Sequence, residues 1–173
     1  MNRCRVYQGW HASASGRLGE TSPDKATEGV GRYVFTNREE TESFTQFRVA
    51  DIVDVKVNLC NFAIPDLADP APRGYAAKDS VTLRNPIDVR EEPLYFLFDE
   101  GDVMLPPDPG DSDWLKAHKE AIRHCGTTDK NWGKTEVCRN TELTRSLCGM
   151  GYDGAIFYDW VVSYPCRRLR GGS

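Results

Sequence analysis

The sequence predicts an α+β protein in which two packed, mainly antiparallel β-sheets carry a few helices. Strand-like segments outnumber helical ones along the chain, and they do not alternate as regular β-α-β units. No glycine-rich loop joins a strand to a helix, which disfavours a Rossmann or P-loop nucleotide site. The 173 residues suit one domain, predicted over residues 1–166, with a flexible tail over residues 167–173.

Apolar patterns locate the predicted strands. Residues 5–10 (RVYQGW) and 31–37 (GRYVFTN) are two short strands, and residues 50–65 alternate, with Val53, Val55 and Val57 on one face. The run LYFLF at 94–98 predicts a buried strand. Residues 154–159 and 160–165 predict two more short strands or one bent strand.

Helical spacing occurs in three places, at residues 38–47, 114–125 and 141–150. Ser112 or Asp113 is the expected N-cap of the second helix. Residues 11–31 are predicted as a loop, with a helical turn starting at Ser22. Prolines break residues 66–93 into loop with a short strand at 80–83, and residues 99–113 form an acidic loop.

Charge and hydropathy exclude several classes of partner. The net charge is −4 with both signs mixed along the chain, which argues against nucleic acid or an anionic membrane as the main partner. No apolar run reaches the roughly 20 residues that cross a bilayer. No apolar signal core follows the N-terminus, so we expect a cytoplasmic location.

The six cysteines offer no clear metal site. They are Cys4, Cys60, Cys125, Cys138, Cys148 and Cys166, and none forms a C-x-x-C pair. A structural zinc site usually takes its ligands from two close pairs. The spacing therefore favours free thiols, with disulfides second and a metal site third.

Four blocks of sequence together resemble a known family. VYQG at residues 6–9, GRYVFTN at 31–37, VKVNLCNFAIP at 55–65 and GYDGAIFYDWVV at 151–162 occur in this order. They are similar to the V-Y-H-G, G-x-Y-F-T, V-x-L-N-I-x-N-P and G-Y-D-G-I-I-F…E-Y-V-V-F blocks of mono-ADP-ribosyltransferases, in the branch of bacterial and phage toxins and effectors. Residues 66–150 match that family poorly, and we expect target recognition to lie in their loops.

The resemblance implies an NAD-dependent reaction, with NAD as co-substrate. Such an enzyme holds the nicotinamide ribose and stabilises an oxocarbenium-like transition state, as glycosidases do. The family resemblance implies a stacking aromatic for nicotinamide and a carboxylate that holds the ribose and stabilises the cationic transition state.

Carried over block by block, the resemblance implies a set of site residues. Gln8 replaces the family's histidine, with Tyr7 beside it, and the backbone of Gly9 would pair with the nicotinamide amide. Tyr33, favoured, or Phe35 would be the stacking aromatic, and Thr36 would line the same cleft. Core packing is the alternative role for both aromatics.

Asp159 matches the family's catalytic glutamate, although its side chain is one methylene shorter. A turn between two strands is the alternative reading for this residue. Asp153 is a rival carboxylate, with the capping of a turn before Gly154 as its alternative role. His11 is a surface residue or, in a shifted register, a ribose contact. His118 and His124 are expected to be structural.

The resulting functional hypothesis is a mono-ADP-ribosyltransferase, a glycosyltransferase that acts as a toxin, effector or virulence factor. Its substrate would be a macromolecule of a host or rival, with protein the favoured class, and a dedicated secretion system would deliver it. One alternative is a binding protein on the same fold with reduced catalysis. Another is a protein inhibitor that acts by contact.

Overall fold

The α+β class is confirmed by the computed structural model, which describes residues 4–13, 16–35, 38–45, 51–67, 95–98, 100–126, 132–157 and 160–171. The strands are β1 (Arg5–Ser13), β2 (Arg32–Phe35), β3 (Asp51–Leu59), β4 (Phe62–Leu67), β5 (Tyr95–Phe98), β6 (Gly154–Ile156) and β7 (Trp160–Ser163). The helices are α1 (Arg38–Thr45), the 3-10 helix η2 (Glu100–Met104), α2 (Asp113–Cys125), α3 (Trp132–Gly149) and α4 (Cys166–Gly171). The predicted strand at 80–83 lies outside the described residues.

The described strands are hydrogen-bonded in one order, β3-β1-β2-β7-β6-β4-β5. Strand β4 runs parallel to β5 and β6, and the remaining neighbours are antiparallel. The prediction of two packed sheets is therefore not confirmed. What the described residues form is one mixed sheet with helices beside it.

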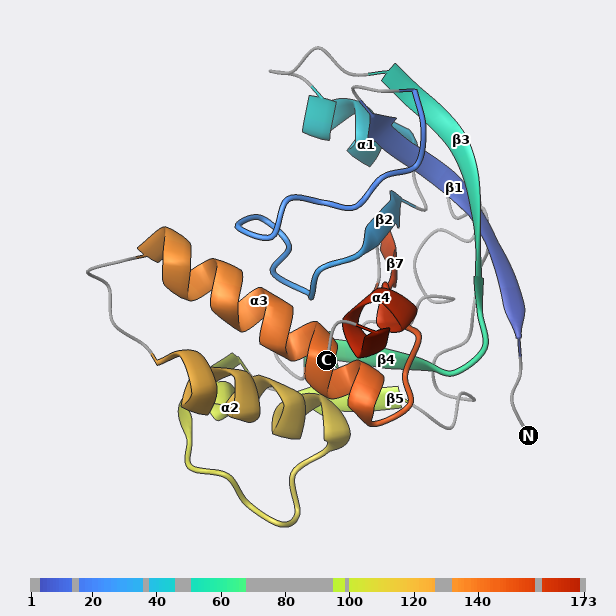
Figure 1. The fold of residues 1–173 in the computed structure, drawn as a ribbon. Helices are drawn as coiled ribbons and strands as arrows, with labels where there is room; N and C mark the ends of the chain where they lie inside the picture. The colour runs from blue at the N-terminus through green and yellow to red at the C-terminus, as the bar shows by residue number, and fades with distance from the viewer. Residues whose placement is uncertain are drawn as a thin grey trace.

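The sheet must curl. Only Cys60 and Asn61 separate β3 from β4 in the sequence, yet four strands lie between them in the sheet order. The end of β3 and the start of β4 must therefore be close in space, and β3 also contacts β7. Figure 1 shows the long β1 and β3 strands running at an angle to β4 and β5.

Asp153 fixes this tight link between β3 and β4. Its carboxylate accepts hydrogen bonds from the backbone N–H groups of Cys60 at 2.6 Å and Asn61 at 3.0 Å. The Asp153 N–H donates in return to the Asn61 carbonyl at 2.8 Å. Charge-assisted bonds to backbone N–H groups are stronger than neutral ones, so this carboxylate has a structural role.

The helices α2 and α3 pack against each other beside the β4–β5 end of the sheet (Figure 1), and the core combines residues of these helices and of the strands. The fully buried side chains include Trp114, Leu59, Ile64, Leu143, Leu147 and Ile156. Ser112 is the N-cap of α2, as predicted, and its side chain accepts a hydrogen bond from the Leu115 N–H at 3.3 Å.

Helix α3 begins at Trp132, whereas the sequence predicted a helix only at residues 141–150. The first half was not recognised because the inner face of α3 is partly polar. Asn140 is buried and donates from Nδ2 to the Pro23 carbonyl at 2.7 Å. Thr144 is also buried, and its hydroxyl lies 3.3 Å from the Val30 carbonyl. These polar contacts hold the loop at residues 16–31, but they interrupt the apolar spacing by which a helix is recognised in a sequence.

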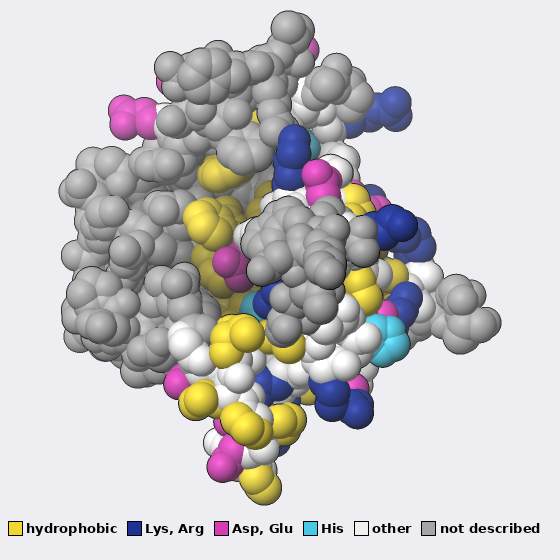
Figure 2. All heavy atoms as spheres, turned by 90° about the vertical axis from the view of Figure 1, so that its left-hand side faces the viewer, with side chains coloured by type: hydrophobic (Ala, Val, Ile, Leu, Met, Phe, Trp, Pro, Cys, Tyr) yellow, Lys and Arg dark blue, Asp and Glu magenta, His cyan; other side chains and the backbone are white. Residues whose placement is uncertain are grey.

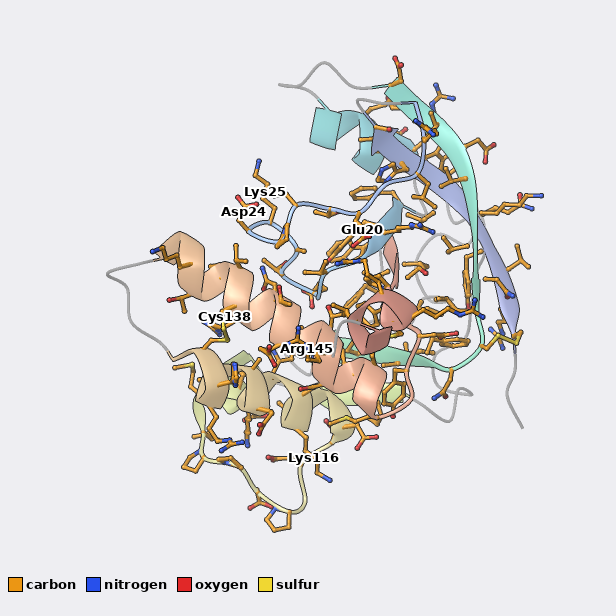
Figure 3. All side chains as sticks on the ribbon, in the orientation of Figure 1. Glu20, Asp24, Lys25, Lys116, Cys138 and Arg145 are labelled. Carbon is orange, nitrogen blue, oxygen red and sulfur yellow. A yellow bond between two sulfur atoms is a disulfide. The ribbon has the colours of Figure 1, made fainter. Side chains whose placement is uncertain are left out.

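The prediction of free thiols is wrong, because all six cysteines are paired as Cys4–Cys60, Cys125–Cys138 and Cys148–Cys166. The first disulfide follows from sheet register. Arg5 pairs with Leu59 across β1 and β3, so the next residues outward, Cys4 and Cys60, meet. Figure 3 shows Cys138 on α3, from which it reaches Cys125 on α2. Three disulfides are typical of proteins in an oxidising environment.

Residues 167–171, predicted as part of a flexible tail, belong to helix α4 (Cys166–Gly171), which the Cys148–Cys166 disulfide ties to the end of α3. A membrane-spanning helix is absent from the described part of the chain, where every helix is too short or too polar.

Candidate functional site

Three of the sequence blocks meet on neighbouring strands. Trp10 of β1 pairs with Phe35 of β2, and Phe35 pairs with Trp160 of β7. Residues paired across strands point to the same face of a sheet. The Phe35 and Trp160 rings are 6.4 Å apart edge to face, and the Trp160 ring is stacked on Phe157 at 5.5 Å. We call Trp10, Phe35, Phe157 and Trp160 the aromatic row.

The aromatic row is a platform rather than a sealed core. Trp10, Phe35 and Trp160 are each half-buried, whereas Phe157 is buried against Trp114 of α2, with the ring centroids 5.6 Å apart. Figure 2 shows hydrophobic side chains gathered in a hollow on one face of the molecule. Half-exposed aromatic side chains on a sheet are suited to stack on a flat ring, including a cationic one.

Gln8 belongs to the same sheet face as Trp10, two residues along β1, and its side chain is half-buried. It pairs with Lys56 of β3. A primary amide donates and accepts hydrogen bonds, so Gln8 can serve a sugar hydroxyl beside the aromatic row.

The Tyr33 hydroxyl forms two hydrogen bonds with the backbone of the protein. The hydroxyl donates to the Gly29 carbonyl at 2.8 Å and accepts from the Glu28 N–H at 3.2 Å. Burial and the charge of Glu28 raise the pKa of Tyr33 well above its usual value. Between the two aromatics weighed for stacking, this geometry favours Phe35.

Tyr7 and Gly9 lie on the opposite face of β1 from Gln8. Tyr7 is buried, with its ring edge-on to Phe62 at a centroid distance of 6.1 Å. A Cβ atom at Gly9 would lie 2.2 Å from the Phe35 carbonyl oxygen, so β1 approaches β2 closely only because this residue is glycine. Their roles toward a cofactor stay predictions.

Thr36 and Asp159 lie outside the described residues. Their neighbours in the sequence are Phe35 and Trp160, which pair with each other across β2 and β7. The Phe157 N–H donates to the Trp160 carbonyl at 2.8 Å, so the chain on either side of residues 158 and 159 is held close together.

His11 is buried and structural rather than a surface residue. Its Nδ1 lies 2.7 Å from the Tyr33 carbonyl, and its Nε2 accepts a hydrogen bond from the Gly19 N–H at 3.4 Å. Because a carbonyl only accepts, Nδ1 carries the proton. His11 thus joins β1 to β2 and to the loop at residues 16–31.

Sequence reasoning missed Trp10, Phe157 and Trp160 as members of this site. A usable signal existed: Trp10 is two residues from Gln8 on a strand, and Trp160 directly follows Asp159. Within the described ranges, no group of three or more His, Cys, Asp and Glu side chains is placed to hold a metal ion.

A second titratable group, His118, is separated from the aromatic row by one ring, since its imidazole lies 4.9 Å from the ring of Trp114, which packs on Phe157. His118 of α2 lines a cavity of about 170 Å³ with Arg139, Glu136 and Asn140 of α3. Burial, and then the charge of Arg139, lower the pKa of His118 to about 4. The side chain is therefore neutral at physiological pH.

Acid should destabilise the protein through His118. Since the unfolded pKa is about 6.5 and the folded pKa is about 4, the unfolded state binds more protons between these values. This contribution is complete above pH 6.5 and is lost as the pH falls. Between pH 7.5 and pH 5 we expect a loss of about 2 kcal/mol in the free energy of unfolding by urea.

In the His118→Asn variant, the free energy of unfolding should fall by about 2 kcal/mol less between pH 7.5 and pH 5 than in the wild type. The matched control is Val137→Ala, which changes an exposed residue without a titratable group on α3 and should keep the wild-type pH dependence. An unchanged pH dependence in His118→Asn would contradict the assignment.

Comparison of the chain with protein-family models, with curated proteins and with solved structures finds no match.

Proposed function

We propose that this protein is an NAD-dependent mono-ADP-ribosyltransferase that modifies a protein of a host or rival. The observation that carries the proposal is the arrangement of the sequence blocks in the sheet. Blocks far apart in the sequence, which resemble three blocks of that family, lie on adjacent strands β1, β2 and β7 and present the aromatic row between them. The fourth block forms β3, β4 and the tight link between them.

The finer fold proposal follows from the curl of the sheet. A two-residue link that carries the chain from β3 at one edge to β4 near the other bends the sheet into two halves. We propose that these halves correspond to the two packed sheets of the ADP-ribosyltransferase fold, with the cofactor cleft where they diverge.

Each side chain then has a defined task. Phe35, with Trp160 beside it, stacks on the nicotinamide ring, which adds on the order of 1 kcal/mol beyond area burial. Gln8 holds a ribose hydroxyl. To Asp159, next to Trp160 in the sequence, we assign the carboxylate whose negative charge stabilises the oxocarbenium-like transition state.

The three disulfides bear on where this activity is used. Because disulfides persist in oxidising environments, they favour a location such as the cell exterior. The sequence alone had suggested the cytoplasm. A toxin or effector released from its cell of origin meets this condition. A protein target fits the net charge of −4 better than nucleic acid does.

A binding protein of the same fold with reduced catalysis is the second candidate. Gln8 in place of the family's histidine and the committed hydroxyl of Tyr33 favour it. It predicts NAD⁺ binding at the aromatic row without release of nicotinamide.

Saturation-transfer NMR with NAD⁺ tests the binding step that both candidates share. We expect transfer from wild-type protein to the nicotinamide ring protons. Phe35→Leu should weaken NAD⁺ binding about fivefold, the equivalent of about 1 kcal/mol. Val137→Ala, a change at an exposed apolar residue of α3, is the matched control. Absence of any transfer at millimolar NAD⁺ would remove both candidates.

A further inference from the structure

A cavity separate from the aromatic row lies where the end of β7, the start of β2 and helix α4 meet. Its volume is about 540 Å³, within the range of small-molecule sites. Arg32, Arg167 and Arg168 line it, together with Glu20, Asn58 and Ser163. Three guanidinium groups around one cavity indicate an anionic ligand, because arginine is the residue best suited to bind phosphate oxygens in pairs.

The acidic side chains of the cavity leave two of these cations without a counterion. Glu20 is paired with Arg168 at 2.6 Å. The Asp153 carboxylate is already bound to the Cys60 and Asn61 N–H groups. Across the described ranges, Arg32 and Arg167 are in no ion pair. Figure 3 shows Glu20 close to β2, on the side of the molecule where α4 lies.

Arg32 and Arg167 are both mounted on fixed elements. Arg32 begins β2 and pairs with Ser163 of β7. Arg167 follows Cys166, which the disulfide to Cys148 ties to α3. Cations held at a set separation lose less freedom when they bind a ligand than cations on a free tail do. The Ser163 hydroxyl and the Asn58 amide add neutral hydrogen-bond donors.

We propose that this cavity binds the phosphate groups of a small diphosphate ligand through Arg32 and Arg167. The site is distinct from the aromatic row. Arg32 and Phe35 are three residues apart on β2, so their side chains point to opposite faces of the sheet, about 10 Å apart along the strand. The proposal therefore goes beyond the proposed transferase activity and does not depend on it.

Isothermal titration calorimetry with inorganic pyrophosphate is the test. We expect saturable binding to the oxidised wild-type protein that weakens as salt is raised. Arg32→Gln and Arg167→Gln should each weaken it about tenfold, because each removes a charge-assisted contact. Arg123→Gln is the matched control, since this exposed arginine of α2 is paired with Glu120 and does not line the cavity.

A second arm with ADP separates the two sources of a diphosphate group. Tighter binding of ADP than of pyrophosphate, with the same loss in both variants, assigns a nucleotide. The reverse order assigns a free polyphosphate, and either result supports the site. No heat of binding at millimolar pyrophosphate, or equal weakening in Arg123→Gln, would overturn the proposal. Phe35→Leu should leave pyrophosphate binding unchanged.

Discussion

Reduction of the three disulfides is expected to unfold the protein at 25 °C. The Cys4–Cys60 bond joins residues 56 positions apart, and chain entropy assigns such a loop about 4 kcal/mol. The other two bonds span 13 and 18 positions and contribute about 3 kcal/mol each. The sum, roughly 10 kcal/mol, is comparable to the whole stability of a domain of this size.

The measurement is thermal or urea unfolding followed by circular dichroism, with and without reductant. The double variant Cys4→Ser/Cys60→Ser should lose more stability than Cys125→Ser/Cys138→Ser, because its loop is longer. Both double variants are kept oxidised so that one bond is removed at a time. A fully reduced protein with the melting temperature of the oxidised form would show that the disulfides contribute nothing to its stability.

Replacement of Asp159 is expected to have the largest effect on catalysis. Asp159→Ala should lower the rate of nicotinamide release from NAD⁺ by about 100-fold, since it removes the one carboxylate assigned to the oxocarbenium-like transition state. Asp159→Glu should retain activity, because glutamate is the residue of the family that this chain resembles.

Asp51→Ala serves as the matched control, because Asp51 is an exposed acid at the start of β3 and is not part of the proposed site. It should release nicotinamide at the wild-type rate. Full activity in a folded Asp159→Ala protein would end the assignment of this residue, and Asp153 could not replace it, since its carboxylate holds the β3–β4 link.

Local patterns predicted much of the fold. Alternation predicted β3, a short strand pattern predicted residues 5–10 of β1, and the apolar face with a cap at Ser112 or Asp113 predicted α2. The first half of α3 was missed because its buried face uses Asn140 for a hydrogen bond to a distant loop. The sheet order and the Cys4–Cys60 pairing depend on the register of strands that lie far apart in sequence, which no local pattern records.

Some residues of the candidate site were likewise predicted from the sequence, and others were found only in the structure. The sequence blocks pointed to Gln8 and to Tyr33 or Phe35, with Tyr33 favoured, and the hydrogen bonds of the Tyr33 hydroxyl are the reason to propose Phe35 instead. Trp10 and Trp160 became visible only through strand pairing. The arginine cavity combines the start of β2 with α4, a segment predicted as a tail, so no sequence pattern pointed to it.

The measurement that tests the central claim most directly is proton NMR of NAD⁺ incubated for hours with the oxidised wild-type protein. We expect saturation transfer to the nicotinamide protons together with the gradual appearance of free nicotinamide. Transfer without release would contradict the transferase and leave the binding protein. The absence of both signals would contradict the assignment of NAD⁺ to the aromatic row.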